Sequence, residues 1–491
     1  MGPHDPARVR DSGLVTRSES GDLLSEARCD PYGHPDRDLM RPRWEELFRG
    51  YDIRGRYPEQ IDDAVAHLLG VAVAQAFPGP FIIGRDVRRE SAQAAKAVEA
   101  GIRSTGRSSE YVGVVPTPMV AFLARHRSSF GLSVTPSHNV LGYVGLKGFT
   151  PSGRVFDSEW KEFRTTFERG FTSPGATGLP PRNRASGIER PQSLRPAYVE
   201  AYLRHVTKDL RTDQTLAVDC RGGATARIAP KALRRIGARV IEVTRGYSPN
   251  FFGKSPEPRP GDVGELGHRV RTEGANAGFA FDGDGDRCLV LDEKGQPMLP
   301  EVVGLLLHSI VTPPSESIVA SADASRVLEK WVRTVRSRVG SRYVLRRMRQ
   351  VGAQVGLEPS GHYYVRPYGS DSDGVLVACL VAHALGRNPD ALTEWKRKVG
   401  PIHRGSFALD FGSSRETRSS FRSIVRSLGP RARRRPEGVY VDLPSGWCLI
   451  RCSNTQPSIR FTFEGATATA FRQVKAIARE VSRGVRSKVR H

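Results

Sequence analysis

Short apolar segments that end in polar loops alternate with alanine-rich or amphipathic segments along most of this chain. Residues 81–86 (FIIGRD) have the pattern of a strand followed by a loop, and 91–104 (SAQAAKAVEAGIRS) continue with helical periodicity. The same order recurs at 215–237, which precedes the strand-like 238–244, and again at 317–335. Repeated strand–loop–helix units predict α/β domains with parallel or mixed sheets.

The length of the chain requires several such domains. It has 491 residues, whereas one hydrophobic core usually supports about 100–200. The first 43 residues are polar and aperiodic and are interpreted as a mobile extension. Gly- and Pro-rich stretches at 172–187 and near Gly386–Pro389 are interpreted as connections. The predicted parts are an extension and four domains, with bounds 1–43, 44–195, 196–298, 299–395 and 396–491.

Basic residues strongly outnumber acidic ones and give a formal net charge of +23. They are spread along the whole sequence, without a nucleic-acid-binding motif or aromatic residues interleaved for base stacking. A specific nucleic-acid partner is therefore not expected, and the diffuse positive field favours small phosphorylated substrates. Two denser runs, 429–435 and 481–491, are interpreted as a solvated loop and tail with a general attraction for polyanions.

Hydropathy and cysteine usage indicate a cytoplasmic protein. No apolar run reaches the ~18 residues that a membrane span needs, and the longest, 302–311, is short. The N-terminal residues lack the apolar core of a secretory signal, and no membrane partner is expected. Six cysteines without a C-x-x-C pair are interpreted as free, mostly buried thiols.

Three aspartates stand together in 281–287 (FDGDGDR). Single glycines separate Asp282, Asp284 and Asp286, and the apolar flanks predict a loop between two strands. In a locally extended chain alternate side chains share one side, so the three carboxylates are expected to converge. Mg²⁺ is typically bound by a few carboxylates together with substrate phosphate. The motif therefore predicts one Mg²⁺ per chain.

A calcium-binding EF-hand is the main alternative for this loop. It shares the D-x-D-x-D opening and would place Glu293 at its twelfth position. However, its sixth position should be glycine, where this chain has Arg287, and its flanks should be helices. The sequence therefore favours a catalytic Mg²⁺ loop over a calcium loop or a plain polar turn.

Two further loops carry groups suited to phosphate chemistry. Ser137 follows an apolar segment in 133–149 (SVTPSHNVLGYVGLKGF). Such a serine is usually a turn residue, but a serine that faces Mg²⁺ can carry a phosphoryl group. In 451–461 (RCSNTQPSIRF), two arginines and several hydroxyl and amide donors surround a turn, as a phosphate dianion requires. These donors are Arg451, Ser453, Asn454, Thr455 and Arg460.

The segment 357–364 (LEPSGHYY) forms a fourth polar loop. Glu358 and Ser360 provide an acceptor and a donor for adjacent sugar hydroxyls. His362 is interpreted equally well as a structural residue or as a functional one.

Taken in this order, the four loops resemble those of the α-D-phosphohexomutase family, which comprises phosphoglucomutases, phosphomannomutases and their amino-sugar relatives. The likeness extends from about residue 45 to the C-terminus. Four more segments look like family landmarks: 48–55 (FRGYDIRG), 84–86 (GRD), 115–119 (VPTPM) and 255–258 (SPEP).

The resemblance implies four domains around a central cleft: three related mixed-sheet α/β domains and a smaller C-terminal α+β domain. It implies a phosphohexomutase that interconverts hexose 1-phosphate and hexose 6-phosphate, with mannose or glucose as the sugar. A hexose 1,6-bisphosphate would be both intermediate and activator, and a monomer or weak dimer is expected.

The same resemblance implies roles for matching residues. Ser137 would be the phosphoryl carrier and would share the metal with Asp282, Asp284 and Asp286. It also implies that Arg54 and Lys147 lie near the reacting oxygen. Either Lys147 or His362 would be the general acid/base. The expected substrate contacts are Glu358 and Ser360 on the sugar, loop 451–455 and Arg460 on the phosphate that does not react, and Arg287.

The serine loop departs from the family pattern Thr-Ala-Ser-His-Asn-Pro. Pro136 precedes the serine, and Val140 replaces the later proline. A second hypothesis is therefore a catalytically impaired mutase-like scaffold whose basic surface binds anionic partners. The favoured hypothesis remains the active mutase, because Ser137 and Lys147 are both present.

Overall fold

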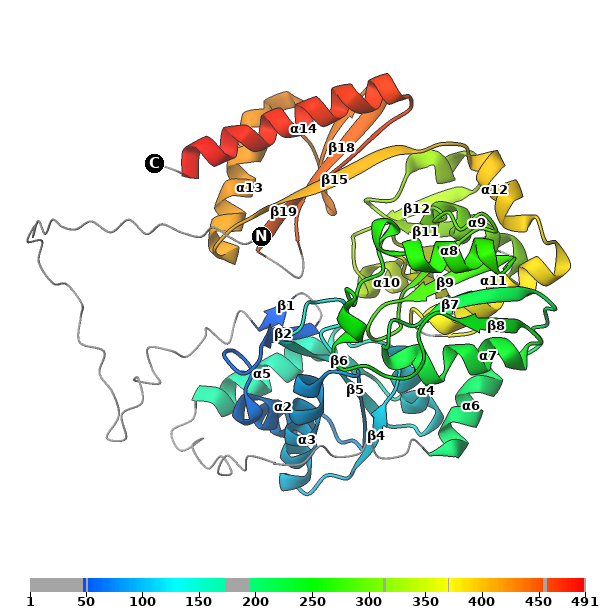
Figure 1. The fold of residues 1–491 in the computed structure, drawn as a ribbon. Coiled ribbons are helices and arrows are strands. Elements are labelled where there is room, and N and C mark those ends of the chain that lie inside the picture. The colour runs from blue at the N-terminus through cyan, green and yellow to red at the C-terminus, as the bar shows by residue number, and fades with distance from the viewer. Residues whose placement is uncertain are drawn as a thin grey trace, which may run out of the picture. The chain divides into compact units, whose positions relative to one another are not determined.

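The computed structural model describes residues 47–49, 52–172, 195–311, 315–369, 371–453 and 457–489. The predicted extension, 1–43, lies outside these residues, as do Asn454 and Thr455. The described chain contains four sheets, three of mixed direction followed by one antiparallel sheet (Figure 1). This confirms the predicted fold class of three α/β domains and a C-terminal α+β domain.

The first sheet has the strand order β1-β2-β6-β5-β3-β4. Its strands are β1 (Phe48–Arg49), β2 (Asp52–Arg56), β3 (Phe81–Arg85), β4 (Ser109–Val114), β5 (Phe130–Val134) and β6 (Tyr143–Phe149). Its helices are α2 (Asp63–Ala76), α3 (Arg89–Ser104), α4 (Thr117–His126) and α5 (Glu159–Thr172). β3 pairs in parallel with β4 and β5, whereas β6 is antiparallel to β5 and β2. The predicted strand at 81–86 and helix at 91–104 are confirmed as β3 and α3.

The second sheet has the order β10-β9-β7-β8. Its strands are β7 (Thr215–Asp219), β8 (Arg239–Glu242), β9 (Ala277–Phe281) and β10 (Cys288–Leu291). Its helices are α6 (Pro196–Val206), α7 (Ala229–Arg235) and α8 (Gly264–Thr272). β7, β8 and β9 are parallel, and β10 folds back antiparallel to β9. The acidic motif therefore forms the turn of a β-hairpin, as its apolar flanks predicted.

The third sheet has the order β12-β11-β13-β14. Its strands are β11 (Ser317–Ser321), β12 (Arg333–Ser337), β13 (Val355–Leu357) and β14 (Tyr363–Val365). Its helices are α9 (Pro300–Ile310), α10 (Ser341–Val351), α11 (Gly374–Arg387) and α12 (Ala391–Val399). The prediction of one strand–helix unit over 317–335 was wrong at its end. A short 3₁₀ helix (Arg326–Lys330) leads directly into β12, which pairs in parallel with β11, and the helix comes later as α10.

One predicted connection and one predicted domain bound also differ from the structure, whereas the predicted connection at 172–187 lies outside the described residues from residue 173 on. Gly386 belongs to the last turn of α11, so only residues 388–390 link α11 to α12. The predicted domain bound at 395 falls inside α12. The remaining domain bounds stay predictions.

The fourth sheet is antiparallel throughout, in the order β15-β19-β18-β17-β16. Its strands are β15 (His403–Asp410), β16 (Arg433–Arg435), β17 (Gly438–Leu443), β18 (Gly446–Cys452) and β19 (Ser458–Gly465). Helices α13 (Ser414–Leu428) and α14 (Ala468–Val489) share a hydrophobic core with alternate strand residues such as Val439, Ile450 and Phe461. Because these residues point to one face of the sheet, both helices cover that face.

The opposite face of this sheet packs against the third domain. Tyr440, Trp447 and Leu449 form a small buried cluster with Ala322. The Tyr440 hydroxyl donates a hydrogen bond to the Ala322 carbonyl at 3.2 Å. An ion pair between Arg404 of β15 and the buried Glu301 of α9 joins the same two domains.

The first three domains share one continuous hydrophobic core that includes residues of all three, for example Val120, Phe279 and Leu380. Within the described part of the chain, no helix is both long and apolar enough to cross a bilayer. The five described cysteines are free thiols, and four of them are buried, in agreement with the sequence prediction; Cys29 lies outside the described residues.

Candidate active site

The three aspartates of the acidic motif converge in the turn between β9 and β10. One carboxylate oxygen from each of Asp282, Asp284 and Asp286 lies within 4.8 Å of the others, and all three residues are buried. The predicted convergence of the three carboxylates is confirmed. The prediction that the backbone from Asp282 to Asp286 is extended was wrong. Asp282 Oδ1 accepts hydrogen bonds from the backbone N–H groups of Gly285 and Arg287 at 3.0 and 3.2 Å. Gly285 has a φ of +75°, so a tight turn brings the carboxylates together.

The electrostatics of this cluster favour a bound cation. Burial raises the pKa of Asp282 well above its ordinary value, and the Asp286 and Asp284 carboxylates raise it further. Burial also acts to raise the pKa of Asp286, but Lys147 and His362 outweigh burial, and this pKa lies well below its ordinary value. Atom Oδ1 of Asp284 is buried without a hydrogen-bond partner. An oxygen-rich site of three carboxylates, one of which keeps an unsatisfied oxygen, suits Mg²⁺.

The serine loop lies directly against this cluster. Ser137 follows β5, is 1% exposed, and adopts a φ of 55° in the left-handed region. Its Oγ donates a hydrogen bond to Asp282 Oδ2 at 3.1 Å. The two residues are 145 positions apart in the sequence, so the fold brings together the two motifs that sequence reasoning linked. Val140, which stands where the family pattern has proline, is 66% exposed and does not enter the cluster.

Arg88 holds the serine loop in this conformation. Its fully buried guanidinium donates hydrogen bonds to the carbonyl oxygens of Ser137, Asn139 and Val140 at 2.9, 2.5 and 2.8 Å. Asp86 forms an ion pair with Arg88 at 3.2 Å. A buried guanidinium that binds three carbonyls of one loop fixes that loop in a conformation that L-residues rarely adopt. Arg88 therefore positions Ser137 through the backbone of the serine loop.

Thr135 completes the support of the serine loop. Its hydroxyl donates to Asp86 Oδ2 at 2.8 Å and accepts a hydrogen bond from the backbone N–H of Ser137 at 2.9 Å. The Asp86 side chain thus supports the loop through both Arg88 and Thr135.

We expect Arg88→Lys to lower turnover about 100-fold, because a small displacement of a reacting group can have an effect of that size. Lysine keeps the positive charge beside Asp86 but cannot bind three carbonyls at once. The measurement is kcat in a coupled sugar-phosphate assay, together with thermal unfolding. The matched control is Arg89→Lys, since Arg89 is the next residue and is exposed at the start of α3. Equal kcat values in the two variants would contradict the positioning role.

Lys147 contacts the aspartates from β6. Its Nζ lies 2.7 Å from Asp284 Oδ2 and 2.6 Å from Asp286 Oδ2. Burial acts to lower the pKa of Lys147, but these two carboxylates outweigh burial and raise that pKa above its ordinary value. Lys147 is therefore a cation.

Arg54 lies on β2 and reaches the serine loop. It forms an ion pair with Asp52 at 2.7 Å and donates a hydrogen bond to Asn139 Oδ1 at 3.0 Å. The structure therefore brings both predicted cationic residues, Arg54 and Lys147, to the serine and aspartate loops.

The sugar loop of the third domain also meets the aspartates. It is the turn between β13 and β14, and the backbones of Arg287 and His362 pair across the two loops. His362 Nε2 lies 3.3 Å from Asp286 Oδ1, and its Nδ1 is 2.8 Å from Ser360 Oγ. Glu358 is 3% exposed and accepts hydrogen bonds from the Tyr364 hydroxyl and the Gly340 N–H, both at 2.7 Å. Its carboxylate is thus held by the protein itself.

Arg287 links the aspartate loop to its neighbours. Its guanidinium binds Glu257 Oε1 and His138 Nδ1, both at 2.7 Å. Burial, reinforced by the charge of Arg287, holds the pKa of His138 well below its ordinary range. His138 is therefore a neutral acceptor for Arg287. The expected contact of Arg287 with substrate stays a prediction.

The predicted phosphate loop starts from the ends of β18 and β19. Arg451 and Arg460 are paired neighbours on these strands, and Ser453 follows β18. The Arg451 guanidinium lies 3.4 Å from Asp323. Burial lowers the pKa of Arg460, and the charge of Arg451 lowers it further. Asn454 and Thr455 lie outside the described residues, so their predicted roles stay untested.

All four domains match one family. The matches are to domains I, II and III of phosphoglucomutase/phosphomannomutase, described as alpha/beta/alpha, over residues 45–170, 196–295 and 301–399, and to its C-terminal domain over 415–481. The chain belongs to the phosphoglucomutase/phosphomannomutase family. The chain is therefore an isomerase-type phosphosugar mutase.

Similar members of the family carry the name phosphoglucosamine mutase. The enzyme of Symbiobacterium thermophilum is 30% identical over 82% of this chain and 89% of its own length. A probable phosphoglucosamine mutase of Methanocella arvoryzae is 29% identical over 88% of this chain and 98% of its own length.

Solved structures of the family share the fold. A phosphoglucomutase/phosphomannomutase family protein from Burkholderia thailandensis has a TM-score of 0.74 at 23% identity, covering 90% of this chain and 98% of its own. A putative phosphomannomutase from Thermus thermophilus has a TM-score of 0.71 at 21% identity, covering 89% of this chain and 98% of its own.

Sequence reasoning missed several residues that contact the aspartate loop. Thr117 donates its backbone N–H to the Asp284 carbonyl at 2.9 Å and its hydroxyl to Asp284 Oδ2 at 2.7 Å. Ser372 donates its hydroxyl to the Asp286 carbonyl at 2.6 Å. Thr117 and Glu257 lie inside the segments VPTPM and SPEP, which the sequence marked as family landmarks without giving them roles.

Proposed function

We propose that the chain interconverts a hexosamine 1-phosphate and the corresponding 6-phosphate, with glucosamine as the sugar and Ser137 as the phosphoryl carrier. The observation that carries the proposal is the 3.1 Å contact between Ser137 Oγ and Asp282 inside a three-aspartate cluster. The names of the similar family members favour glucosamine over the glucose or mannose predicted from sequence.

Mg²⁺ fits the donor set of this site. Asp282, Asp284 and Asp286 would hold it, together with an oxygen on Ser137. When bound, the ion would offset negative charge on the phosphate that is transferred. An N-acetylphosphoglucosamine mutase from Aspergillus fumigatus with the same fold was solved in complex with GlcNAc-6P and magnesium.

The proposed transfer uses one reactive centre twice. The bond between phosphorus and Ser137 Oγ breaks as a sugar hydroxyl forms a new bond to phosphorus, which gives a hexosamine 1,6-bisphosphate. The bisphosphate then turns around, and its other phosphate returns to Ser137. The attacking hydroxyl must lose a proton, and His362, which contacts Asp286, is one candidate acceptor. Lys147 is the other candidate acid/base group, but as a cation it would first donate a proton and could accept one only afterwards. Arg54 and Lys147 would orient the reacting groups.

Substrate would be held by two sets of contacts that serve both orientations. Ser360 and Glu358 would bind hydroxyls near the middle of the sugar, which requires Glu358 to exchange a protein partner for the substrate. Arg451, Ser453, Asn454, Thr455 and Arg460 would bind the phosphate that does not react. A sugar bisphosphate would act as activator because it restores the phosphate on Ser137.

A substrate panel tests this proposal. The enzyme is supplied with Mg²⁺, a sugar 1,6-bisphosphate and either glucosamine, glucose or mannose 1-phosphate, and the 6-phosphate product is measured. We expect the highest kcat/KM with glucosamine 1-phosphate. A higher value with glucose or mannose 1-phosphate would overturn the choice of sugar but not the mutase, and no product from any of the three would overturn both.

We expect Arg451→Ala to weaken binding of the sugar phosphate about 10- to 100-fold, because one hydrogen bond to a charged group contributes about 1.5–3 kcal/mol. KM should rise more than kcat falls, since this phosphate does not react. Calorimetric titration with glucosamine 6-phosphate measures the affinity. Arg433→Ala is the control, because Arg433 is exposed on β16 of the same sheet. Unaltered affinity in Arg451→Ala would contradict the phosphate contact.

A further inference from the structure

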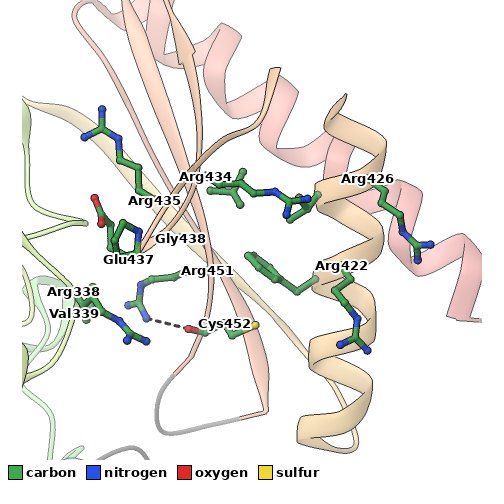
Figure 2. Close-up of a pocket in the computed structure, with 14 residues that line it drawn as sticks. Arg338, Val339, Arg422, Arg426, Arg434, Arg435, Glu437, Gly438, Arg451 and Cys452 are labelled. Atoms are coloured by element: carbon green, nitrogen blue, oxygen red, sulfur yellow. Dashed lines mark hydrogen bonds between the residues drawn. The ribbon is translucent and has the colours of Figure 1, made fainter. Parts of the chain in front are cut away.

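A cavity of about 650 Å³ is lined mainly by the C-terminal domain, and none of the three aspartates is among its lining residues. It is bounded by α13, the β16–β17 hairpin, the end of β18, and Arg338 and Val339 of the third domain (Figure 2). Small-molecule sites in proteins have volumes of about 300–1,000 Å³, so this cavity has the size of a ligand site.

The rim of the cavity is strongly basic. It carries Arg338, Arg422, Arg426, Arg434, Arg435 and Arg451, against the single carboxylate of Glu437. All of these arginines except Arg451 are exposed, and among the residues that the structure describes no carboxylate forms an ion pair with any of those five. Arg422 and Arg426 also stand one helical turn apart on α13, where like charges repel.

The floor of the cavity is apolar. Val425 and Val439 are buried there, and Phe421 is half-buried beside them. Figure 2 shows Arg434 extending from the hairpin toward α13, whereas Arg338 and Arg451 lie at the other end of the cavity. The cavity thus combines an apolar floor with positive charge at both ends. A sugar phosphate is polar over its whole surface and would leave the floor unused.

We propose that this cavity binds a nucleoside polyphosphate, with the base on the apolar floor and the phosphates on the arginines. The planar guanidinium matches phosphate oxygens in pairs and also stacks on aromatic rings. Several arginines around one cavity suit a chain of phosphates better than a single one. The site is separate from sugar turnover except at Arg451, which also belongs to the proposed phosphate loop, and it does not depend on the proposed function.

Calorimetric titration of the full chain with ATP tests the proposal, in low-salt buffer where charges on an exposed rim are only weakly screened. The test variant is the double substitution Arg422→Glu and Arg426→Glu. The matched control is Arg415→Glu and Arg418→Glu, which makes the same charge change at exposed positions of α13 that do not line the cavity. We expect ATP binding to weaken about 30-fold in the test variant and less than about threefold in the control. Thermal unfolding of both variants verifies that they fold.

Several outcomes would overturn the proposal. ATP could fail to bind the native chain, or it could bind the test variant and the control equally. If tripolyphosphate binds as tightly as ATP, the apolar floor has no role and the site takes any polyanion. If saturating glucosamine 1,6-bisphosphate displaces ATP from the cavity, the ATP site is the phosphosugar site already proposed.

Discussion

Ser137→Ala is expected to lose mutase turnover by about 10⁴-fold or more, because removal of a covalent nucleophile has effects of this order in enzymes that depend on one. Alanine keeps the loop anchored by Arg88, since Arg88 binds the backbone carbonyl and not the hydroxyl of residue 137. The affinity for glucosamine 6-phosphate should therefore change little. The measurements are kcat in the coupled assay and calorimetric affinity, each compared with the native chain.

The control for this variant is Ser108→Ala, which removes a hydroxyl from an exposed position of the same domain. The native chain should also show a species heavier by ~80 Da that maps to residue 137, as expected for one phosphate. Retained turnover in Ser137→Ala would remove this serine from its proposed role. It would leave the fold and the family membership unaffected.

Asp284→Asn is expected to lower kcat by about 10²–10³-fold and to weaken the response to Mg²⁺ in the same variant. Both expectations have one cause: the substitution removes a carboxylate whose Oδ1 is buried without a partner and whose Oδ2 binds Lys147. The measurement is kcat as a function of Mg²⁺ concentration, with Mn²⁺ binding followed separately by calorimetry. Native-like values in both experiments would contradict a metal site at this loop.

Asp213→Asn is the matched control for the metal prediction, because Asp213 is exposed and lies in the loop before β7. It should leave kcat and Mn²⁺ affinity unchanged. A chelator should abolish turnover in the native chain, and added Mg²⁺ should restore it. A loss of turnover in the Asp213→Asn control similar to that in Asp284→Asn would indicate a general charge effect instead.

The sequence predicted the parts of this site that are local in the chain. The aspartates at 282, 284 and 286 are close together in sequence, and the apolar segments around them form β9 and β10 as predicted. The link from Ser137 to these residues was implied by the family resemblance of the four motifs, and the hydrogen bond to Asp282 supports it. By contrast, the tight turn at Gly285 depends on backbone hydrogen bonds to one Asp282 oxygen, which residue spacing does not reveal.

Features that depend on packing were not predictable in the same way. Arg88 is one arginine among many in a basic chain, and only the folded structure shows its guanidinium buried against three carbonyls. The hydroxyl of Thr117 reaches Asp284 across 167 positions of sequence. The prediction for 317–335 was wrong because residues 333–337 (RTVRS) contain a single apolar residue, so their sequence pattern does not distinguish a strand from a helix end. In the fold, pairing with β11 makes these residues a strand.

In the proposed mechanism, Ser137 carries the phosphate between the two ends of the sugar. Rapid-quench mixing of the dephosphorylated enzyme with radiolabelled glucosamine 1,6-bisphosphate tests it directly. The label should appear on Ser137 at a rate at least equal to kcat and should leave again when glucosamine 1-phosphate is added. Turnover that proceeds while the label never reaches residue 137 would contradict the claim.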